Sequence, residues 1–562
     1  MAEIRSYSFP SPSTEPASPP PAHAGVDLSR LNFLVVDSIP DMRAATCSLL
    51  SGFGAGRVDY TGRAGDAIGM MRRGEYDVIL SEFDLGTGFD GLYLFEEARR
   101  YGILKASCVF VIVTAERRAT RVISAAELAP DAIVLKPYNG ETLYGKLIRA
   151  IRRKARVRPI DEAILAHDFL QAIRLCDEGI KAGGEEATAY LRMKVHLQLR
   201  VGDWGGVRNL CRELLPQADL PWVRMALGKA LYHLDGFEEA RTVFQGVIVE
   251  HELVMEAYDW LARTQRASGD VAGALETLKR AAARSPFVVG RQRDLGELAW
   301  HAGDLVTAEA AIGATVRLAR YSFWRDPADL GRLVEVQLAR GDTAGARRSV
   351  AELRKEYRET AAIALADALD ADIWLKQGDS AKARTALDES LQAVETLQAP
   401  PPAEIGLAVA NACMNQQRFD VGEKLVCTVL KNRHDDRALQ QRAADVFRRA
   451  GREETGQRLI EQTAQDIVSL NNEAVRLAQS GDLAAAAEHF IRAVTDMPAN
   501  AQVLVNAVNA LLAFVNRNGW HDTYMHLAEE YLERVRALEP ENGRALQLAE
   551  IRRRTCQRFR KS

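Results

Sequence analysis

The sequence predicts an α/β doubly wound domain with a five-stranded sheet, followed by an all-α superhelical solenoid of helical repeats. Two observations carry this prediction. Between residues 31 and about 150, short apolar runs alternate with helical stretches. After residue 151 a sequence pattern recurs in which a polar turn is followed by a small residue. The expected segments are a disordered Pro/Ser-rich leader (1–28), the α/β domain (29–152), about eleven repeats (153–548) and a basic C-terminal tail (549–562).

The strands of the first domain are predicted from short apolar runs. Four runs stand out, at 33–36, 78–80, 109–113 and 133–135, and a weaker strand is expected at 57–61. Continuous apolar runs of this length are typical of parallel strands that are buried on both faces. Helical stretches are expected between and after them, for example at 92–100 and 141–152.

Polar residues follow four of these strands. They are Asp37, Glu82, Thr114 and Lys136. In an open parallel sheet the chemistry gathers at the carboxyl ends of the strands, so we expect these side chains to lie close together.

Four segments, VVDSIPDMR, YDVILSEFDLGTGFDGLYL, VFVIVTAE and VLKPY, resemble the receiver domains of two-component response regulators in order and spacing. The resemblance implies a phosphoacceptor Asp after the third strand, an acidic pair after the first that helps to hold Mg²⁺, and a Thr or Ser and a Lys that contact the phosphoryl oxygens. Phosphoryl transfer needs a cation and fixed donors around these oxygens. Asp37 matches the first acid, Thr114 the hydroxyl and Lys136 the lysine.

Three positions depart from the receiver pattern. Ser38 replaces the second acid, and Glu82 occupies the phosphoacceptor position. The usual aromatic switch residue, three positions before the lysine, is Ile133. Asp84 falls where the family offers a backbone carbonyl to the metal, and a displaced acceptor at Asp84 is an alternative.

These departures predict a receiver with little or no phosphorylation. Ser38 removes one carboxylate from the cation site, so Mg²⁺ is expected to bind weakly at Asp37 or not at all. Glu82 moves the acceptor by roughly 1.5 Å, in a reaction that tolerates about half an ångström. Three interpretations stay open: a frozen platform with a Glu82–Lys136 ion pair, a permanent mimic of the phosphorylated state, and residual phosphorylation.

The second region repeats one unit with a period near 34 residues. A small or short residue marks each unit and lets two helices pack closely; these markers are Ala172, Val207, Ala240, Ala274, Ala308, Ala346, Ala383, Gly422, Gly456, Ala486 and Ala528. The period, with Leu-Gly upstream and Pro downstream, resembles the tetratricopeptide repeat. The resemblance implies helical hairpins stacked into a superhelix whose concave groove binds peptides or protein surfaces; a pure spacer is the alternative.

Composition excludes several classes of function. The net charge of -3 gives no electrostatic argument for nucleic-acid binding. The seven cysteines form no zinc spacing, which fits a reducing cytoplasm, and no apolar run is long enough for a membrane span. Basic residues cluster at 149–158, either as a complement to the dipole of a helix that ends there or as a docking site for an acidic partner or, more weakly, for nucleic acid or anionic lipid.

The sequence therefore predicts a cytoplasmic bacterial signalling adaptor and no enzyme. Its partners are expected to be other proteins, bound by the repeat groove and the receiver face, with no DNA-binding domain and no small-molecule substrate. No cofactor is expected. The alternative is a phosphorylation-responsive regulator whose output is the repeat region, and the pair Ser38 and Glu82 favours the adaptor.

Overall fold

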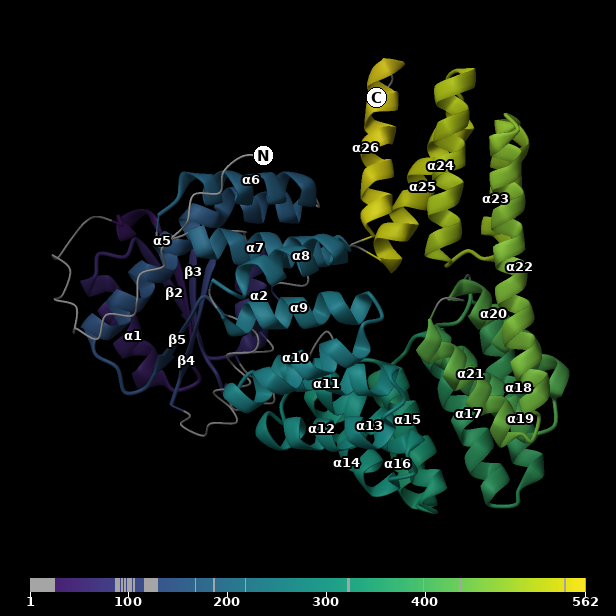
Figure 1. The fold of residues 1–562 in the computed structure, drawn as a ribbon. Coiled ribbons are helices and arrows are strands. Elements are labelled where there is room, and N and C mark those ends of the chain that lie inside the picture. Colours follow the sequence, from purple (N-terminus) through teal and green to yellow (C-terminus); the bar gives the residue numbers. More distant parts are fainter. Residues whose placement is uncertain are drawn as a thin grey trace. The chain divides into compact units, whose positions relative to one another are not determined.

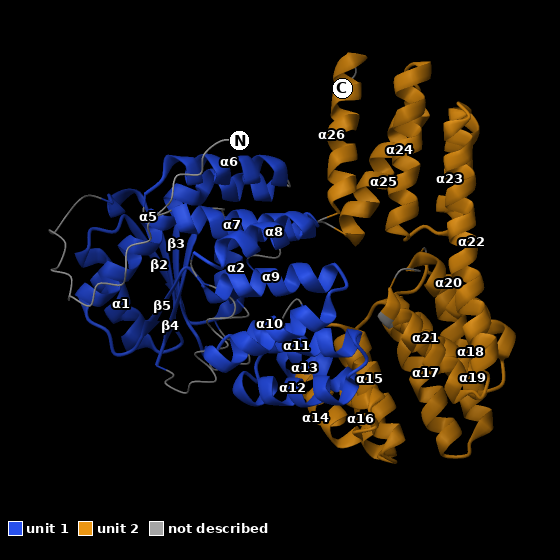
Figure 2. Cartoon of the chain, in the orientation of Figure 1, with its two compact units in different colours: residues 1–298, 317–324 blue, residues 299–316, 325–562 orange. Residues whose placement is uncertain are grey.

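The computed structural model describes residues 26–560, except 86–90, 92–93, 96–97, 99–103, 105–106, 116–129, 167, 185–186, 218, 321–323, 398, 434–435 and 540–541. The chain divides into two compact units (Figure 2). Unit 1 comprises residues 1–298 and 317–324, and unit 2 comprises 299–316 and 325–562. No helix in the described part of the chain combines the length and the apolar character that crossing a membrane requires.

The first domain contains the predicted five-stranded parallel sheet (Figure 1). Its strands are β1 (Asn32–Val36), β2 (Arg57–Thr61), β3 (Val78–Glu82), β4 (Val109–Thr114) and β5 (Ala132–Leu135), in the spatial order β2-β1-β3-β4-β5. Every neighbouring pair is parallel, so the strands end at one edge of the sheet. The doubly wound fold class is confirmed.

Both faces of this sheet are covered, which explains the continuous apolar runs. A 3₁₀ turn, η1 (Leu28–Arg30), precedes β1, and the flanking helices are α1 (Pro40–Gly52), α2 (Ala64–Arg73) and α5 (Gly140–Leu165). On one face Phe33 and Val35 pack in one apolar cluster with residues of α1 and α5. On the other, Leu34 and Val36 pack with α2. The helix expected at 92–100 lies largely outside the described residues.

Helix α5 differs from the expectation that the first domain ends near residue 152. It is one helix of 26 residues, and it carries the chain from the sheet into the repeats with Pro159 inside it. Its first turns pack on the sheet through Leu143 and Leu147, and its end contacts α6. The expected border at 152/153 therefore falls within a helix.

Helices then follow one another to the C-terminus (Figure 1). They are α6 (Phe169–Ala182), α7 (Ala187–Arg200), α8 (Trp204–Leu214), α9 (Pro221–His233), α10 (Phe237–Glu250), α11 (Met255–Ala267), α12 (Val271–Arg284), α13 (Val289–His301), α14 (Leu305–Ala319), α15 (Pro327–Ala339), α16 (Thr343–Glu356), α17 (Thr360–Lys376), α18 (Ser380–Glu395), α19 (Ala403–Asn415), α20 (Phe419–Asn432), α21 (Arg437–Arg449), α22 (Glu453–Gln479), α23 (Leu483–Asp496), α24 (Ala501–Asn518), α25 (Asp522–Leu538) and α26 (Gly543–Arg558).

The marker residues behave as the repeat predicts. All eleven are buried, each in the second helix of a hairpin.

Several turns between helices share a Gly-Asp sequence. Gly269 has a positive φ of 89°, and Asp270 after it caps α12 by accepting a hydrogen bond from the backbone N–H of Gly273. The same Gly-Asp pair forms the turns before α8, α16, α18 and α23.

Two helices depart from the simple hairpin scheme. Helix α22 has 27 residues and contacts α21 and α20 as well as α23, so it serves two successive repeats without a break. Helix α26 extends to Arg558. The residues expected to form a basic tail from 549 are thus helical as far as 558, and Leu548 in this helix packs into the apolar cluster of α24 and α25.

Candidate functional site in the first domain

Three of the predicted site residues meet at the carboxyl edge of the sheet. Asp37 follows β1, Glu82 ends β3 and Lys136 follows β5. The Lys136 ammonium lies between the two acids: it donates to Asp37 Oδ2 at 2.7 Å and also to Glu82 Oε2. All three side chains are buried. The edge therefore holds two carboxylates bridged by one ammonium, which we call the buried triad.

The remaining carboxylate oxygens of the triad are also occupied. The backbone N–H of Ile39 donates to Asp37 Oδ1 at 2.9 Å, and that of Phe83 donates to Glu82 Oε1 at 2.9 Å. Each of the four oxygens thus accepts at least one hydrogen bond from within the domain. Such bonds hold both carboxylates in fixed orientations.

The electrostatics follow from two acids sharing one cation. Burial raises the pKa of Glu82, and the negative charge of Asp37 adds to this, so that the attraction of Lys136 does not compensate. Burial lowers the pKa of Lys136, but hydrogen bonds and charges from both acids outweigh it, so this pKa is raised. With both acids ionised, the triad carries one uncompensated negative charge.

The other predicted residues lie near the triad but differ in exposure. Thr114 ends β4 and is buried, and its carbonyl accepts a hydrogen bond from the Lys136 N–H at 2.7 Å. Ser38 and Asp84 are exposed. Ile133 is partly buried and packs on the apolar cluster beneath the sheet. Of the two carboxylates proposed as acceptor, Glu82 is the one that the structure brings to Lys136.

The donor set does not fit a magnesium ion. Mg²⁺ needs several hard oxygen ligands with free lone pairs, and here one ammonium contacts both acids while Ser38 supplies no carboxylate. Across the described residues, no group of three or more His, Cys, Asp or Glu side chains is placed to hold a metal ion.

Sequence reasoning missed the neighbours that support the triad. Tyr138, two residues after Lys136, shares a 2.7 Å hydrogen bond with the hydroxyl of Thr46 in α1, and burial raises its pKa. Arg43 donates to the Asp37 carbonyl at 2.6 Å. Gly91 packs so closely that a Cβ there would lie 2.1 Å from the Glu82 carbonyl oxygen. Only the Tyr after Lys-Pro was visible as a sequence signal, in VLKPY.

The structure overturns the helix-end explanation of the basic cluster at 149–158. These residues lie in the middle of α5, where no helix terminus exists. Some of them form ion pairs with nearby acids: Arg153 with Asp131 at 3.7 Å, and Lys154 with Asp161 at 2.9 Å. Neutralisation by nearby acids accounts for part of the cluster.

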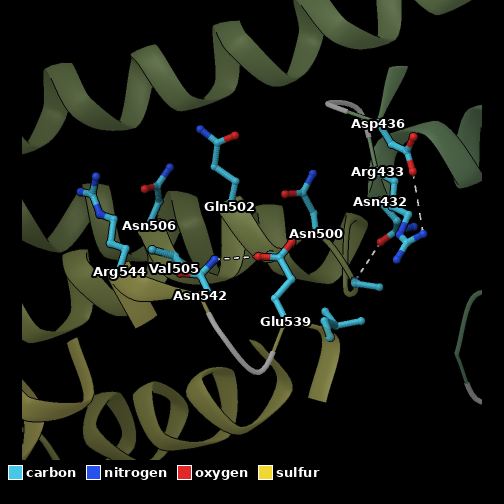
Figure 3. A pocket seen from close by; sticks show the side chains of 13 residues that line it. Asn432, Arg433, Asp436, Asn500, Gln502, Val505, Asn506, Glu539, Asn542 and Arg544 are labelled. Carbon is cyan, nitrogen blue, oxygen red and sulfur yellow. Dashed lines mark hydrogen bonds and ion pairs between the residues drawn. The ribbon is translucent and has the colours of Figure 1, made fainter. Parts of the chain in front are cut away.

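A second feature is an open polar pocket of about 410 Å³ in unit 2 (Figure 3). It lies where α21, α24 and α26 begin, and its walls include Arg433, Gln502 and Arg544. Many of its polar groups already bond within the protein; Asn542, for example, donates to Glu539 at 2.7 Å. The pocket thus offers mixed charges with no dominant sign.

Comparisons with known proteins agree with the two-part architecture. The family model described as the response regulator receiver domain matches residues 33–148, and a tetratricopeptide repeat model matches residues 255–280. The chemotaxis protein CheY-3 of Vibrio cholerae is 27% identical over 123 residues, which cover 22% of this chain and 93% of that protein. The chemotaxis protein CheY of Pseudomonas aeruginosa is 26% identical over 123 residues, 22% of this chain and 98% of that protein.

Among solved structures, the C-terminal part of a TPR repeat-containing protein from Cytophaga hutchinsonii matches 43% of this chain and 96% of its own, with 12% identity and a TM-score of 0.35.

The two family matches suggest a signalling protein of the response-regulator type with a protein-interaction region. More particularly, the chain is a receiver domain joined to tetratricopeptide repeats, as its sequence predicts. Domains of these two kinds are generally non-catalytic.

Proposed function

We propose that this protein is a cytoplasmic bacterial signalling adaptor whose receiver domain is a fixed platform that accepts no phosphoryl group. Its repeat region holds partner proteins, and its receiver face docks on a regulatory partner. The proposal includes no small-molecule substrate, no cofactor and no DNA-binding domain. The observation that carries it is the Lys136 ammonium between the carboxylates of Asp37 and Glu82.

The triad supports the platform interpretation over the other two. Phosphoryl transfer requires an acceptor oxygen that is free to attack, whereas both oxygens of Glu82 accept hydrogen bonds from Lys136 and Phe83. A permanent mimic would have to signal outward through the switch position. Ile133, which occupies this position, has no polar group that could form a contact dependent on the charge of Glu82. That charge therefore acts on Lys136 and is not passed on through the switch position.

A phosphorylation assay tests the proposal. The full chain is incubated with a small-molecule phosphodonor and Mg²⁺ and its intact mass is measured, with the double variant Glu82→Asp/Ser38→Asp as the matched comparison. We expect no phosphoryl adduct on the natural chain and partial modification of the double variant, because Asp37, Thr114 and Lys136 are present in both. An adduct on Glu82 or Asp84 of the natural chain would instead establish the phosphorylation-responsive alternative.

A further inference from the structure

The first helices of four successive repeats in unit 2 bring a cluster of acids together. We call Glu335 of α15, Asp372 of α17, Glu404 of α19 and Asp445 of α21 the inner acidic cluster. Ion pairs link the same helices: Arg332 of α15 bonds Glu404 at 2.7 Å, and Arg449 of α21 lies 3.6 Å from Glu335. Contacts between residues more than seventy positions apart show that the repeats curve around this cluster.

Three of the four acids have a basic partner. Glu404 binds both Arg332 and Arg442, Glu335 binds Arg449, and Asp445 binds His301 at 3.1 Å and Arg448 at 2.5 Å. The guanidinium group of Arg449 also forms a cation–π contact, with its Cζ 4.9 Å from the centroid of the Trp300 ring. Each of these acids is therefore neutralised within unit 2.

Asp372 is the exception. It is partly buried and accepts hydrogen bonds from the side-chain amides of Asn415 at 2.8 Å and Asn411 at 3.4 Å, but within the described residues it forms no ion pair. Lys376, one turn further along α17, is exposed and does not pair with it. Burial raises the pKa of Asp372 to about 7; the charge of Glu335 adds to this, and the two amides and Arg449 oppose it.

An unfilled acceptor lies beside this acid. Asn411 is only 8% exposed, and its Nδ2 is directed at Asp372. Its Oδ1 is buried and has no hydrogen-bond partner. Buried acceptors are nearly always satisfied, so an empty one next to an unneutralised carboxylate calls for a donor that is also a cation.

We propose that Asp372 and Asn411 form a site for one lysine side chain of a partner protein. A lysine ammonium has three donors and a compact charge, so it can serve the Asp372 carboxylate and the Asn411 Oδ1 together. The inference rests on the proposed role of the repeats in holding proteins and specifies what they recognise. A divalent ion fits less well, because Asn411 and Asn415 turn N–H groups, not oxygens, toward Asp372.

The site predicts a particular pH dependence. The ammonium binds the ionised form of Asp372, and with a pKa of about 7 the ionised fraction rises through neutral pH. Binding should therefore tighten as pH rises, by about tenfold between pH 6 and pH 8. The lysine itself remains charged over this range.

The test measures fluorescence anisotropy of a labelled Ser/Ala peptide with one central lysine, titrated with the full chain. We expect saturable binding that weakens at least about tenfold in Asp372→Asn and severalfold in Asn411→Leu. The matched control is Asp370→Asn, two residues away on α17, where the acid pairs with Arg354 at 2.7 Å. This control should bind like the natural chain.

Three results would overturn the proposal: no binding by the natural chain, equal binding by Asp372→Asn, or equal binding of the same peptide with acetyl-lysine. Thermal melting followed by circular dichroism checks that each variant is folded. The phosphodonor assay does not involve Asp372, so failure of the lysine site and failure of the platform proposal are recorded separately.

Discussion

Replacing Lys136 with Met tests whether the buried triad holds the receiver edge together. The variant leaves Asp37 and Glu82 buried side by side with no cation. At an effective dielectric constant of about 20, Coulomb's law gives about 6 kcal/mol for the Lys136–Asp37 pair at 2.7 Å. Desolvation cancels part of this, and removing one partner of a buried pair costs about 3–5 kcal/mol.

Hydrogen exchange measured by mass spectrometry is the suitable assay, because it reports local stability within a long chain. A loss of about 3 kcal/mol or more should accelerate exchange in β1 and β3 at least about a hundredfold at pH 7. The control is Lys146→Met, which removes a single 2.5 Å hydrogen bond to the Ile133 carbonyl and should cost about 1 kcal/mol. Equal protection of β1 and β3 in Lys136→Met and the natural chain would refute the reasoning.

Three further outcomes are expected. Ala274→Arg should lower the stability of the repeats by more than about 2 kcal/mol in chemical unfolding, because this position is fully buried between helices, while Ala272→Arg on the exposed side of the same helix should change it little. Gly228→Ala should cost about 1–3 kcal/mol in the same assay, since the new Cβ would lie 2.6 Å from the Phe244 ring; an unchanged midpoint would show that the ring moves freely. The raised pKa of Glu82 gives a contribution to stability that is complete below its unfolded value of about 4.5 and is lost as pH rises through the higher folded value, so protection of β3 should fall as pH rises above about 4.5, and Glu82→Gln should flatten that trend.

The sequence was sufficient for the sheet and for the meeting of Glu82 with Lys136. Apolar runs located four of the five strands to within two residues, because continuous apolar runs are typical of parallel strands that are buried on both faces, and the weaker strand at 57–61 was also placed correctly. Turn chemistry located the hairpins, because Gly with a positive φ and a capping Asp are local requirements.

The inner acidic cluster could not be predicted in the same way. His301 and Asp445 are 144 positions apart, and their contact depends on the curvature that many small packing angles produce together. The continuity of α5 and α22 was also missed. The border expected at 152/153 lies inside α5, which packs on the sheet at its start and on α6 at its end.

The unbroken path of α5 has a consequence for how such a protein can change in evolution. A helix advances about 1.5 Å and turns about 100° per residue, so one inserted residue between the sheet and the repeats would rotate everything downstream by that angle. Seven residues bring the phase back to within about 20°. We therefore expect insertions or deletions in this part of α5 among related proteins to have lengths of three, four or seven residues.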